Sequence, residues 1–293
     1  QSFLWSHGYF LEKRQGMKVK IWGCRGSLPS PSPENLRYGG NTSCIQVIQE
    51  DTQVILDAGS GIVRLGKFLS PEIKEVHIFL THLHIDHTLG LGFFLPLYNP
   101  KVKVHIYGPC ISSDPLLKRL RRYFSPPLFP VKLSELPRHP EVHELGDDEF
   151  KIGAFTVNSE FICHPGPTLG FRLTVGDKSM AYLPDHEVML GSVDFPKQPE
   201  WTSGFELANK VDLLFHDGAY TSKEYVGKMG WGHSSIRDAI LFAKMCEVKK
   251  LSVFHHEPTR TDEQVYRNLQ EIQQQGELKF DLEMCAEGNT YEL

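Results

Sequence analysis

Short apolar runs that end at Gly, Asp or Pro dominate the first half of the chain. They are rich in β-branched and aromatic residues, a pattern that predicts strands. These runs cover residues 18–23, 43–49, 53–59 and 75–82. Amphipathic stretches at 61–69 and 114–123 predict helices.

The order of elements recurs in the second half. Strands are expected at 155–164, 171–175, 179–185 and 251–256, and helices at 236–248 and 262–276, where Gly276 would stop the last helix. The Pro-rich stretch 125–140 is the only candidate boundary between domains. We therefore expect a single α/β domain over residues 17–293, with two sheets flanked by helices.

Composition is that of an ordinary globular protein, with 40% hydrophobic and 23% charged residues. The apolar alternation begins at Met17, so residues 1–16 are expected to be a leader or tag-like segment outside the fold. The sequence contains no membrane-spanning run and no signal-peptide pattern, which favours a cytoplasmic protein. Six scattered cysteines without CxxC spacing are expected to be packed thiols.

The charge balance gives little attraction for a polyanion. The net charge is −5 and the pI is about 6.3, so long nucleic acid is a less natural partner than a small ligand. The one basic run is expected to be the solvated face of a helix. It consists of Lys118, Arg119, Arg121 and Arg122.

Four potential metal ligands crowd the end of the strand at 75–82. His82 and His84, two residues apart, would point the same way, while the turning chain presents Asp86 and His87 to a second ion. A chance grouping at the end of a buried strand is the alternative. Ionisable groups packed this densely would be costly to bury without a metal, so the cluster predicts a metal site.

Further candidate ligands stand at other strand ends, where the chain enters Gly- or Pro-bearing loops. They are His164, Asp185 and the pair His255 and His256. Taken alone, each could be a strand-end histidine or a helix cap. Beside the first cluster they become candidates to complete a two-metal site.

These motifs, with LDAGSG at 56–61, resemble the metallo-β-lactamase fold superfamily, and within it the phosphodiesterase branch that includes tRNase Z and cyclic phosphodiesterases. The resemblance covers Met17 to the C-terminus and implies a four-layer αβ/βα sandwich with two mixed sheets. It also implies two divalent ions, with Zn²⁺ preferred and Mn²⁺ or Fe²⁺ as alternatives.

The resemblance also implies which residue holds which ion. His82, His84 and His164 would hold the first ion, and Asp86, His87 and His255 the second. Asp185 would bridge both. The register of residues 251–254 selects His255 over His256.

GWGHSS at 230–235 supplies the extra histidine of the phosphodiesterase branch, His233, and Asp217 stands where that branch carries its partner acid. In the implied mechanism, a metal-activated hydroxide, with Asp86 among the groups around it, attacks phosphorus. His233, held by Asp217, would protonate the leaving alkoxide. A cap at the start of the following helix is the alternative role for His233.

The short segment between His164 and Asp185 bears on the size of the substrate. In tRNase Z a long tRNA-gripping arm lies between the third histidine ligand and the bridging aspartate, whereas only a short TVGDKS turn with its flanking strands separates His164 from Asp185 here. We therefore expect a small phosphodiester such as a cyclic nucleotide. Trp231 and Tyr220 could stack on a base, although core packing is the favoured role of each alone.

Other classes remain open. The same metals could hydrolyse a lactone, thioester or β-lactam, or the chain could cleave tRNA 3′ ends in the manner of tRNase Z. A non-catalytic protein that kept the fold is a third class. Homodimers are common in the related branch, so the resemblance allows a homodimer.

Overall fold

Two mixed β-sheets form the centre of the molecule. The computed structural model describes residues 16–189, 191, 194–274 and 278–293, and within them each sheet has seven strands. The first sheet contains, in spatial order, β14 (Thr290–Glu292), β1 (Lys18–Gly23), β2 (Cys44–Gln49), β3 (Thr52–Leu56), β4 (Glu75–Phe79), β5 (Lys103–Pro109) and β6 (Glu141–Leu145). The second contains β13 (Asp281–Met284), β12 (Lys250–Phe254), β11 (Leu213–Asp217), β10 (Lys178–Leu183), β9 (Leu169–Val175), β8 (Phe155–Phe161) and β7 (Asp148–Ile152).

The two sheets have matching strand directions. Strands β3 to β6 of the first sheet are parallel to one another, as are β10 to β13 of the second, and the remaining neighbours are antiparallel. The carboxyl ends of parallel strands meet at one edge of a sheet. Loops that follow β3, β4, β10, β11 and β12 are thereby placed where ligands can converge.

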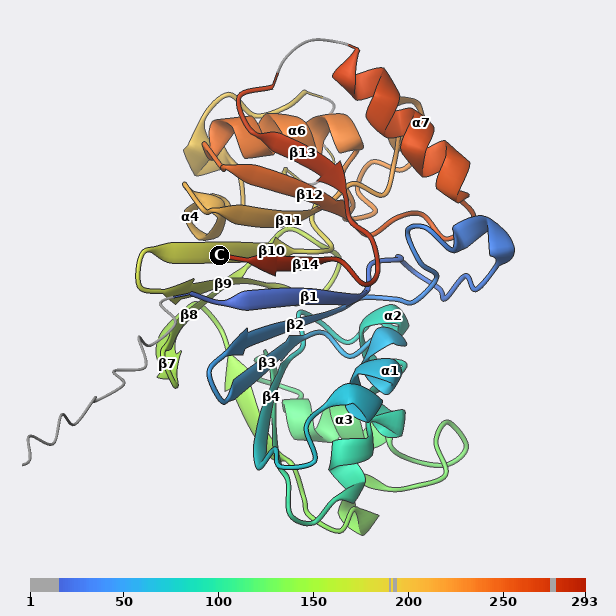
Figure 1. Cartoon of the computed structure of the whole chain (residues 1–293), viewed down its shortest axis with the longest axis vertical. Helices are drawn as coiled ribbons and strands as arrows, with labels where there is room; N and C mark the ends of the chain where they lie inside the picture. The colour runs from blue at the N-terminus through green and yellow to red at the C-terminus, as the bar shows by residue number, and fades with distance from the viewer. Residues whose placement is uncertain (1–15, 190, 192–193, 275–277) are drawn as a thin grey trace, which may run out of the picture.

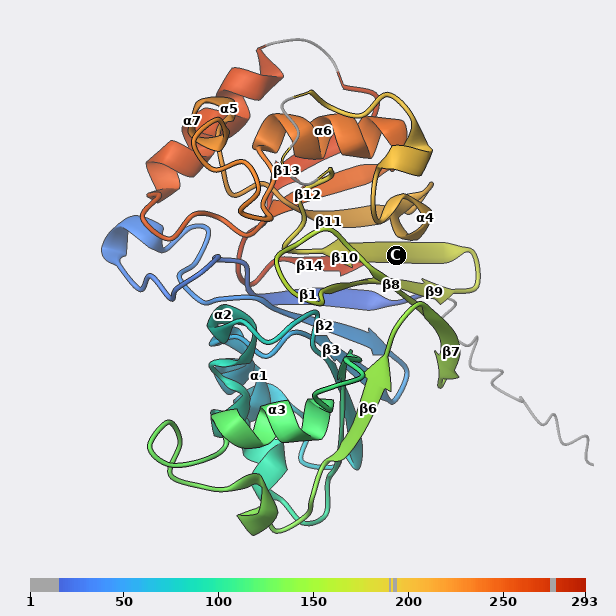
Figure 2. The ribbon, with the colours of Figure 1, turned by 180° about the vertical axis from the view of Figure 1, so that it is seen from behind.

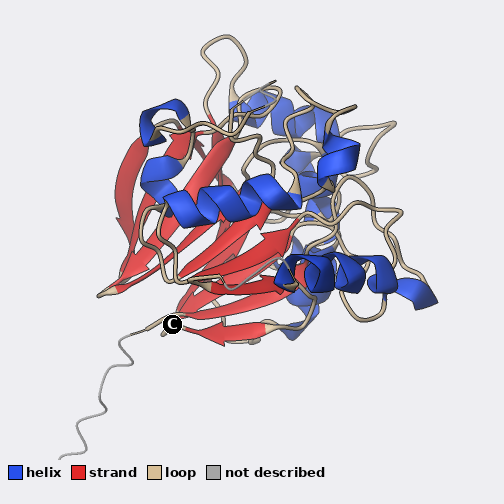
Figure 3. Cartoon of the chain, turned by 90° about the horizontal axis from the view of Figure 1, so that it is seen from above, coloured by secondary structure: helices blue, strands red, loops and turns tan. Residues whose placement is uncertain are grey.

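Helices cover the outer face of each sheet, which gives four layers (Figure 1). Their bounds are α1 (Gly61–Phe68), α2 (Ile85–Thr88), α3 (Leu116–Tyr123), α4 (Phe205–Ala208), α5 (Ser222–Tyr225), α6 (Ile236–Met245) and α7 (Asp262–Gln273). Figure 2 shows α3 beside β6, and Figure 3 shows the strands lying between helices. The expected four-layer αβ/βα sandwich is confirmed.

Three apolar clusters hold the layers together. One is shared by both sheets and includes Val47, Phe79 and Phe171, all fully buried. The other two join each sheet to its helices, for example through Leu65 of α1 and Phe242 of α6. Alternation along the strands sends residues to these two sides in turn, which is why the apolar runs predicted the strands.

The segment that contains and follows the end of the histidine cluster forms short helices. The α-helix α2 includes the cluster's own Asp86 and His87, and short 3₁₀ helices at Leu91–Phe93 and Leu95–Tyr98 follow it. Glycines and a proline in this segment oppose a longer α-helix.

Of two other sequence-based expectations, one cannot be compared with the structure and one is wrong for a single residue. The expected stop of α7 at Gly276 lies outside the described residues. Cys110 is exposed, so the expectation that all six cysteines are packed thiols is wrong for this residue. In the described ranges, every helix is too short or too polar for a membrane span.

Candidate metal centre and active site

The loop after β4 brings its polar side chains together at the edge of the first sheet. His84 is extended and begins α2, so His82 precedes the helix while Asp86 and His87 lie within it. All of these except His84 are buried. The exposed His84 marks the side on which the site opens to solvent.

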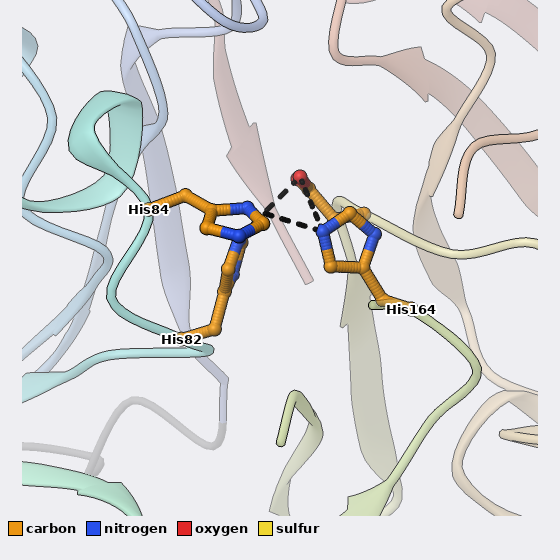
Figure 4. A group of neighbouring side chains, drawn as sticks. His82, His84 and His164 are labelled. Carbon is orange, nitrogen blue, oxygen red and sulfur yellow. Dashed lines mark hydrogen bonds and ion pairs between the residues drawn. The ribbon is translucent and has the colours of Figure 1, made fainter. Parts of the chain in front are cut away.

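The first group of candidate ligands combines His82, His84, His164 and Asp185, whose ligand atoms lie within 4.8 Å of one another. His164 Nε2 is 3.2 Å from His84 Nδ1. Asp185 Oδ2 is 3.6 Å from His82 Nε2 and 3.7 Å from His164 Nε2. Figure 4 shows His82 and His84 approaching from one side and His164 from the other.

The second group combines Asp86, His87, His255 and again Asp185, and all four are buried. Asp86 Oδ2 lies 3.3 Å from His87 Nε2 and 3.1 Å from His255 Nε2. Asp185 Oδ1 lies 3.0 Å from His87 Nε2 and 3.3 Å from His255 Nε2. Asp185 thus directs one oxygen to each group, which is the arrangement a bridging carboxylate needs.

The second ring nitrogen of three histidines is held by a neighbouring group. His87 Nδ1 is 2.7 Å from Asp57 Oδ2, His82 Nδ1 is 3.0 Å from Thr81 Oγ1, and His164 Nδ1 is 2.8 Å from the Gly232 carbonyl. Such contacts fix the tautomer and orientation of metal-binding imidazoles. In each case the nitrogen that faces the cluster is Nε2.

Sequence reasoning did not assign a role to Asp57, although it lies in the LDAGSG motif. Its carboxylate is fully buried and also accepts hydrogen bonds from the Thr81 amide, at 2.8 Å, and the Tyr182 hydroxyl, at 2.9 Å. Its backbone is left-handed, with φ of 60°. A strained, buried aspartate at the end of a strand is a signal for a site, and here it orients His87.

Buried atoms without partners provide a test of whether metal ions fit. Among the described residues, His82 Nε2 and Asp185 Oδ1 are buried and make no hydrogen bond. His87 Nε2, although 3.0 Å from Asp185 Oδ1, is not aligned for one. Leaving such groups unsatisfied is costly. Two divalent cations would satisfy them, so the residues fit a dinuclear centre.

Electrostatics differ between the two groups. Burial, followed by the charge of His87, holds the pKa of His82 well below its usual value, and burial also lowers the pKa of His164. Those imidazoles are neutral, the form that binds metals. Burial also lowers the pKa of His255, but the carboxylates, Asp185 first, outweigh it and raise the pKa to about 9. The carboxylates of the second group therefore favour a positive charge beside them, which a divalent cation would supply.

His233 and Asp217 are brought together beside the candidate ligands. His233 Nδ1 lies 2.7 Å from Asp217 Oδ2, and the His233 ring stacks on that of His255 with centroids 4.8 Å apart. Asp217 is fully buried and also accepts a hydrogen bond from the Ala219 amide at 2.9 Å. The carboxylate is rigidly placed, and it leaves Nε2 of His233 as the nitrogen available to a substrate.

Glu187 shapes the loop that carries His233, a role that sequence reasoning missed. Its buried carboxylate accepts hydrogen bonds from the amides of Gly230, at 2.9 Å, and Gly232, at 2.8 Å. Gly232 has φ of 85°, and a Cβ there would collide with His164. The only local signal was an acid two residues after Asp185.

The final strand-end pair separates as its register suggests. His255 has a left-handed φ of 60° and joins the second group, whereas His256 Nε2 lies 2.8 Å from the Cys285 carbonyl, away from the site. Gly26 is needed for this arrangement, because a Cβ there would collide with the His255 ring.

One expectation about a nearby residue is corrected. Trp231 is 60% exposed, so core packing is wrong for it, whereas Tyr220 is buried as expected. Arg25 has a structural role, since it is fully buried and donates to backbone carbonyls, including that of Gly39 at 2.8 Å.

The fold and these two ligand groups define a hydrolase of the metallo-β-lactamase fold with a site suited to two metal ions. The chain belongs to the Beta-lactamase superfamily domain family, whose sequence profile matches residues 52–256.

Several proteins are similar to this chain in sequence or in fold. Ribonuclease Z of Thermococcus gammatolerans is 27% identical over 257 residues, which cover 73% of this chain and 78% of the relative. A diphosphatase of the PhnP family shares the fold, with a TM-score of 0.65 and 19% identity over 95% of this chain and 97% of that one. Zn²⁺-bound PqqB of Methylobacterium extorquens does so with a TM-score of 0.66 and 15% identity over 94% and 100%. The resemblance found in the sequence is thereby confirmed.

Proposed function

We propose that this chain is a zinc-dependent phosphodiesterase that hydrolyses a small phosphodiester such as a cyclic nucleotide. In this proposal His82, His84 and His164 bind one ion. The second ion is bound by Asp86, His87 and His255. Asp185 is shared.

The contact between His233 and Asp217 is the observation that carries the proposal. An alkoxide leaving group is strongly basic and departs slowly unless it receives a proton. Nε2 of His233 is the proton donor, and the 2.7 Å contact from Nδ1 to Asp217 orients the ring. Thioesters and nitrophenyl esters have less basic leaving groups than an alkoxide, so they have less need of a proton donor.

The metal ions, when bound, supply activation of water and Lewis-acid stabilisation of a phosphoryl oxygen. The protein's own residues position the reaction. Asp57 and Thr81 fix the imidazoles of His87 and His82. Glu187 fixes the loop that presents His233. Zinc is favoured because the first group is dominated by neutral imidazoles.

The hairpin between His164 and Asp185 supports a small substrate. Strands β9 and β10 are joined directly at Gly176 and Asp177, so no long arm is inserted there. The rim of the site instead carries Trp231 with Lys228 Nζ 5.4 Å from its ring centroid. An exposed indole and a cation together suit a base and a phosphate.

The basic helix α3 gives little support for a long polyanion. Lys118 Nζ lies 3.4 Å and Arg122 Nη1 2.9 Å from the Asp114 carboxylate. Arg119 is largely buried and donates to backbone carbonyls, including that of Asp114. Only Arg121 in this run has no acidic partner among the described residues.

Cleavage of tRNA 3′ ends is the second candidate, and the Ribonuclease Z relative favours it. Both candidates use the same metals and the same proton donor. The two candidate functions differ in the size of substrate that the surroundings of the site must bind. A comparison of kcat/KM for small and large substrates therefore distinguishes them.

The test is a panel of substrates for zinc-loaded protein of measured metal content. We expect turnover of bis-nitrophenyl phosphate and of a cyclic nucleotide, with higher kcat/KM for the cyclic nucleotide than for a tRNA precursor with a 3′ trailer. A higher kcat/KM for the precursor would show that the substrate is tRNA and not a small diester. Hydrolysis of a nitrophenyl ester or a lactone without any phosphodiesterase activity would overturn the proposal.

A further inference from the structure

A second group of histidines and carboxylates lies away from the metal centre, on β4, β5 and β6. These strands are parallel, and their register places His77 opposite His105 and His105 opposite Glu141. Since alternate residues of a strand share a face, Glu75 and His143 lie on the same face as these three. The group occupies the first three residues of each strand, whereas the catalytic loop follows the carboxyl end of β4.

His105 is the centre of this group, and its two ring nitrogens have different partners. Nε2 lies 2.6 Å from Glu75 Oε1. Nδ1 lies 2.9 Å from His143 Nε2 and 3.5 Å from Glu141 Oε2. The Glu75 contact places the proton on Nε2, so the lone pair of Nδ1 points toward His143 and Glu141.

The distances around Nδ1 match those between ligands of one ion. Zinc binds nitrogen and oxygen at about 2.0–2.2 Å, so tetrahedral ligands lie about 3.3 Å from each other. The separations of 2.9 and 3.5 Å bracket that value. A small movement of the exposed Glu141 side chain is enough to complete the geometry.

We propose that His105 Nδ1, His143 Nε2 and Glu141 Oε2 form a third metal site, separate from the catalytic centre. It would take a borderline divalent ion such as Zn²⁺, with water in the remaining position. Glu75 serves as the outer carboxylate that orients His105, as is common for histidine ligands.

Charges near the site are compatible with this role. Lys103 Nζ lies 3.1 Å from Glu141 Oε1, which leaves Oε2 directed to the histidines, and 3.9 Å from Glu75. Its positive charge weakens the attraction for a cation, so the site should bind less tightly than the catalytic one. Burial lowers the pKa of His143, which favours the neutral imidazole. The glutamate side chains are 48% and 51% exposed, so an ion can enter from solvent.

His77 packs beside the site and is not one of its ligands. Its ring stacks on His105 with centroids 4.6 Å apart, and its Nδ1 lies 3.2 Å from the Tyr107 hydroxyl. A set made of Glu75, His77 and His105 is disfavoured, because the 2.6 Å contact between Glu75 and His105 is too short for two ligands of one ion.

The test counts zinc in the full chain after dialysis against micromolar free zinc, by inductively coupled plasma mass spectrometry. We expect His143→Ala and Glu141→Gln to bind one ion fewer than the wild type, with unchanged hydrolysis of bis-nitrophenyl phosphate. His139→Ala is the matched control, because this exposed histidine contacts only the Ser134 carbonyl among the described residues. It should retain the wild-type metal content, as should His77→Phe.

Wild-type metal content in both His143→Ala and Glu141→Gln would overturn the third site. Loss of an ion in His77→Phe but not in Glu141→Gln would overturn the assignment of ligands. Because Glu141 is exposed, Glu141→Gln is expected to fold. If His143→Ala does not fold, the zinc content of Glu141→Gln alone decides the test. The comparison is a difference between variants, so it does not depend on the catalytic reaction.

Discussion

Replacing His233 by alanine separates proton donation from metal binding. The side chain belongs to neither ligand group, and among the described residues its only hydrogen bond is to Asp217. Zinc content should therefore be unchanged. Loss of a positioned general acid costs about 10²- to 10⁴-fold in rate, or about 3–5 kcal/mol of transition-state stabilisation.

The size of that loss should depend on the leaving group. A nitrophenolate departs readily without a proton, so His233→Ala should reduce kcat for bis-nitrophenyl phosphate by less than about 10-fold. A diester with an alkoxide leaving group should lose the full amount. The measurement is kcat for the two substrates on wild-type and variant protein of equal zinc content.

Asp217→Asn provides the companion variant. An asparagine keeps the shape of the side chain but weakens the contact that orients the His233 ring, so the loss should again be larger for the alkoxide substrate. Equal losses on both substrates, or a lower zinc content in His233→Ala, would refute the reasoning.

Three further predictions follow from buried groups. Asp57→Asn should weaken binding of one of the two catalytic ions by about 10- to 100-fold, because His87 loses its orienting carboxylate; zinc titration measures this, and unchanged affinity would contradict the role. Glu187→Gln should lower kcat while leaving zinc content intact, since an amide NH₂ would meet the backbone N–H donors that hold the His233 loop; wild-type kcat would argue against it. Burial lowers the pKa of His77 from the ordinary 6.5 to about 4. Between these pH values the unfolded chain binds more protons than the folded one. The free energy of unfolding should therefore decrease as the pH falls from 6.5 to 4. Urea unfolding of metal-free protein should show a smaller loss over this range in His77→Phe, and an equal loss would exclude His77 as a cause.

The positions of the candidate ligands could be predicted because they follow apolar runs. The strand before His82 and the strand before His255 are both buried, and a polar residue directly after such a strand stands out in the sequence. The structure brings these residues together, with His164 and Asp185, as two groups. Assignment of each ligand to an ion rests on the family resemblance and stays a prediction.

The groups that hold the ligands could not be predicted, because their contacts depend on tertiary structure. Glu187 meets amides at Gly230 and Gly232, more than forty positions away, and no local pattern encodes that pairing. Strand β6 was missed for another reason. Its residues Glu141 and Glu144 are exposed, so the run lacks the apolar character that marks a buried strand.

The most direct test of a two-metal site is a crystal structure of the zinc-loaded protein with anomalous data at the zinc edge. We expect two peaks about 3.5–4 Å apart in the catalytic site. One should be surrounded by His82, His84 and His164, and Asp185 should lie between the two. A single peak in the site, or two peaks without Asp185 between them, would contradict the account.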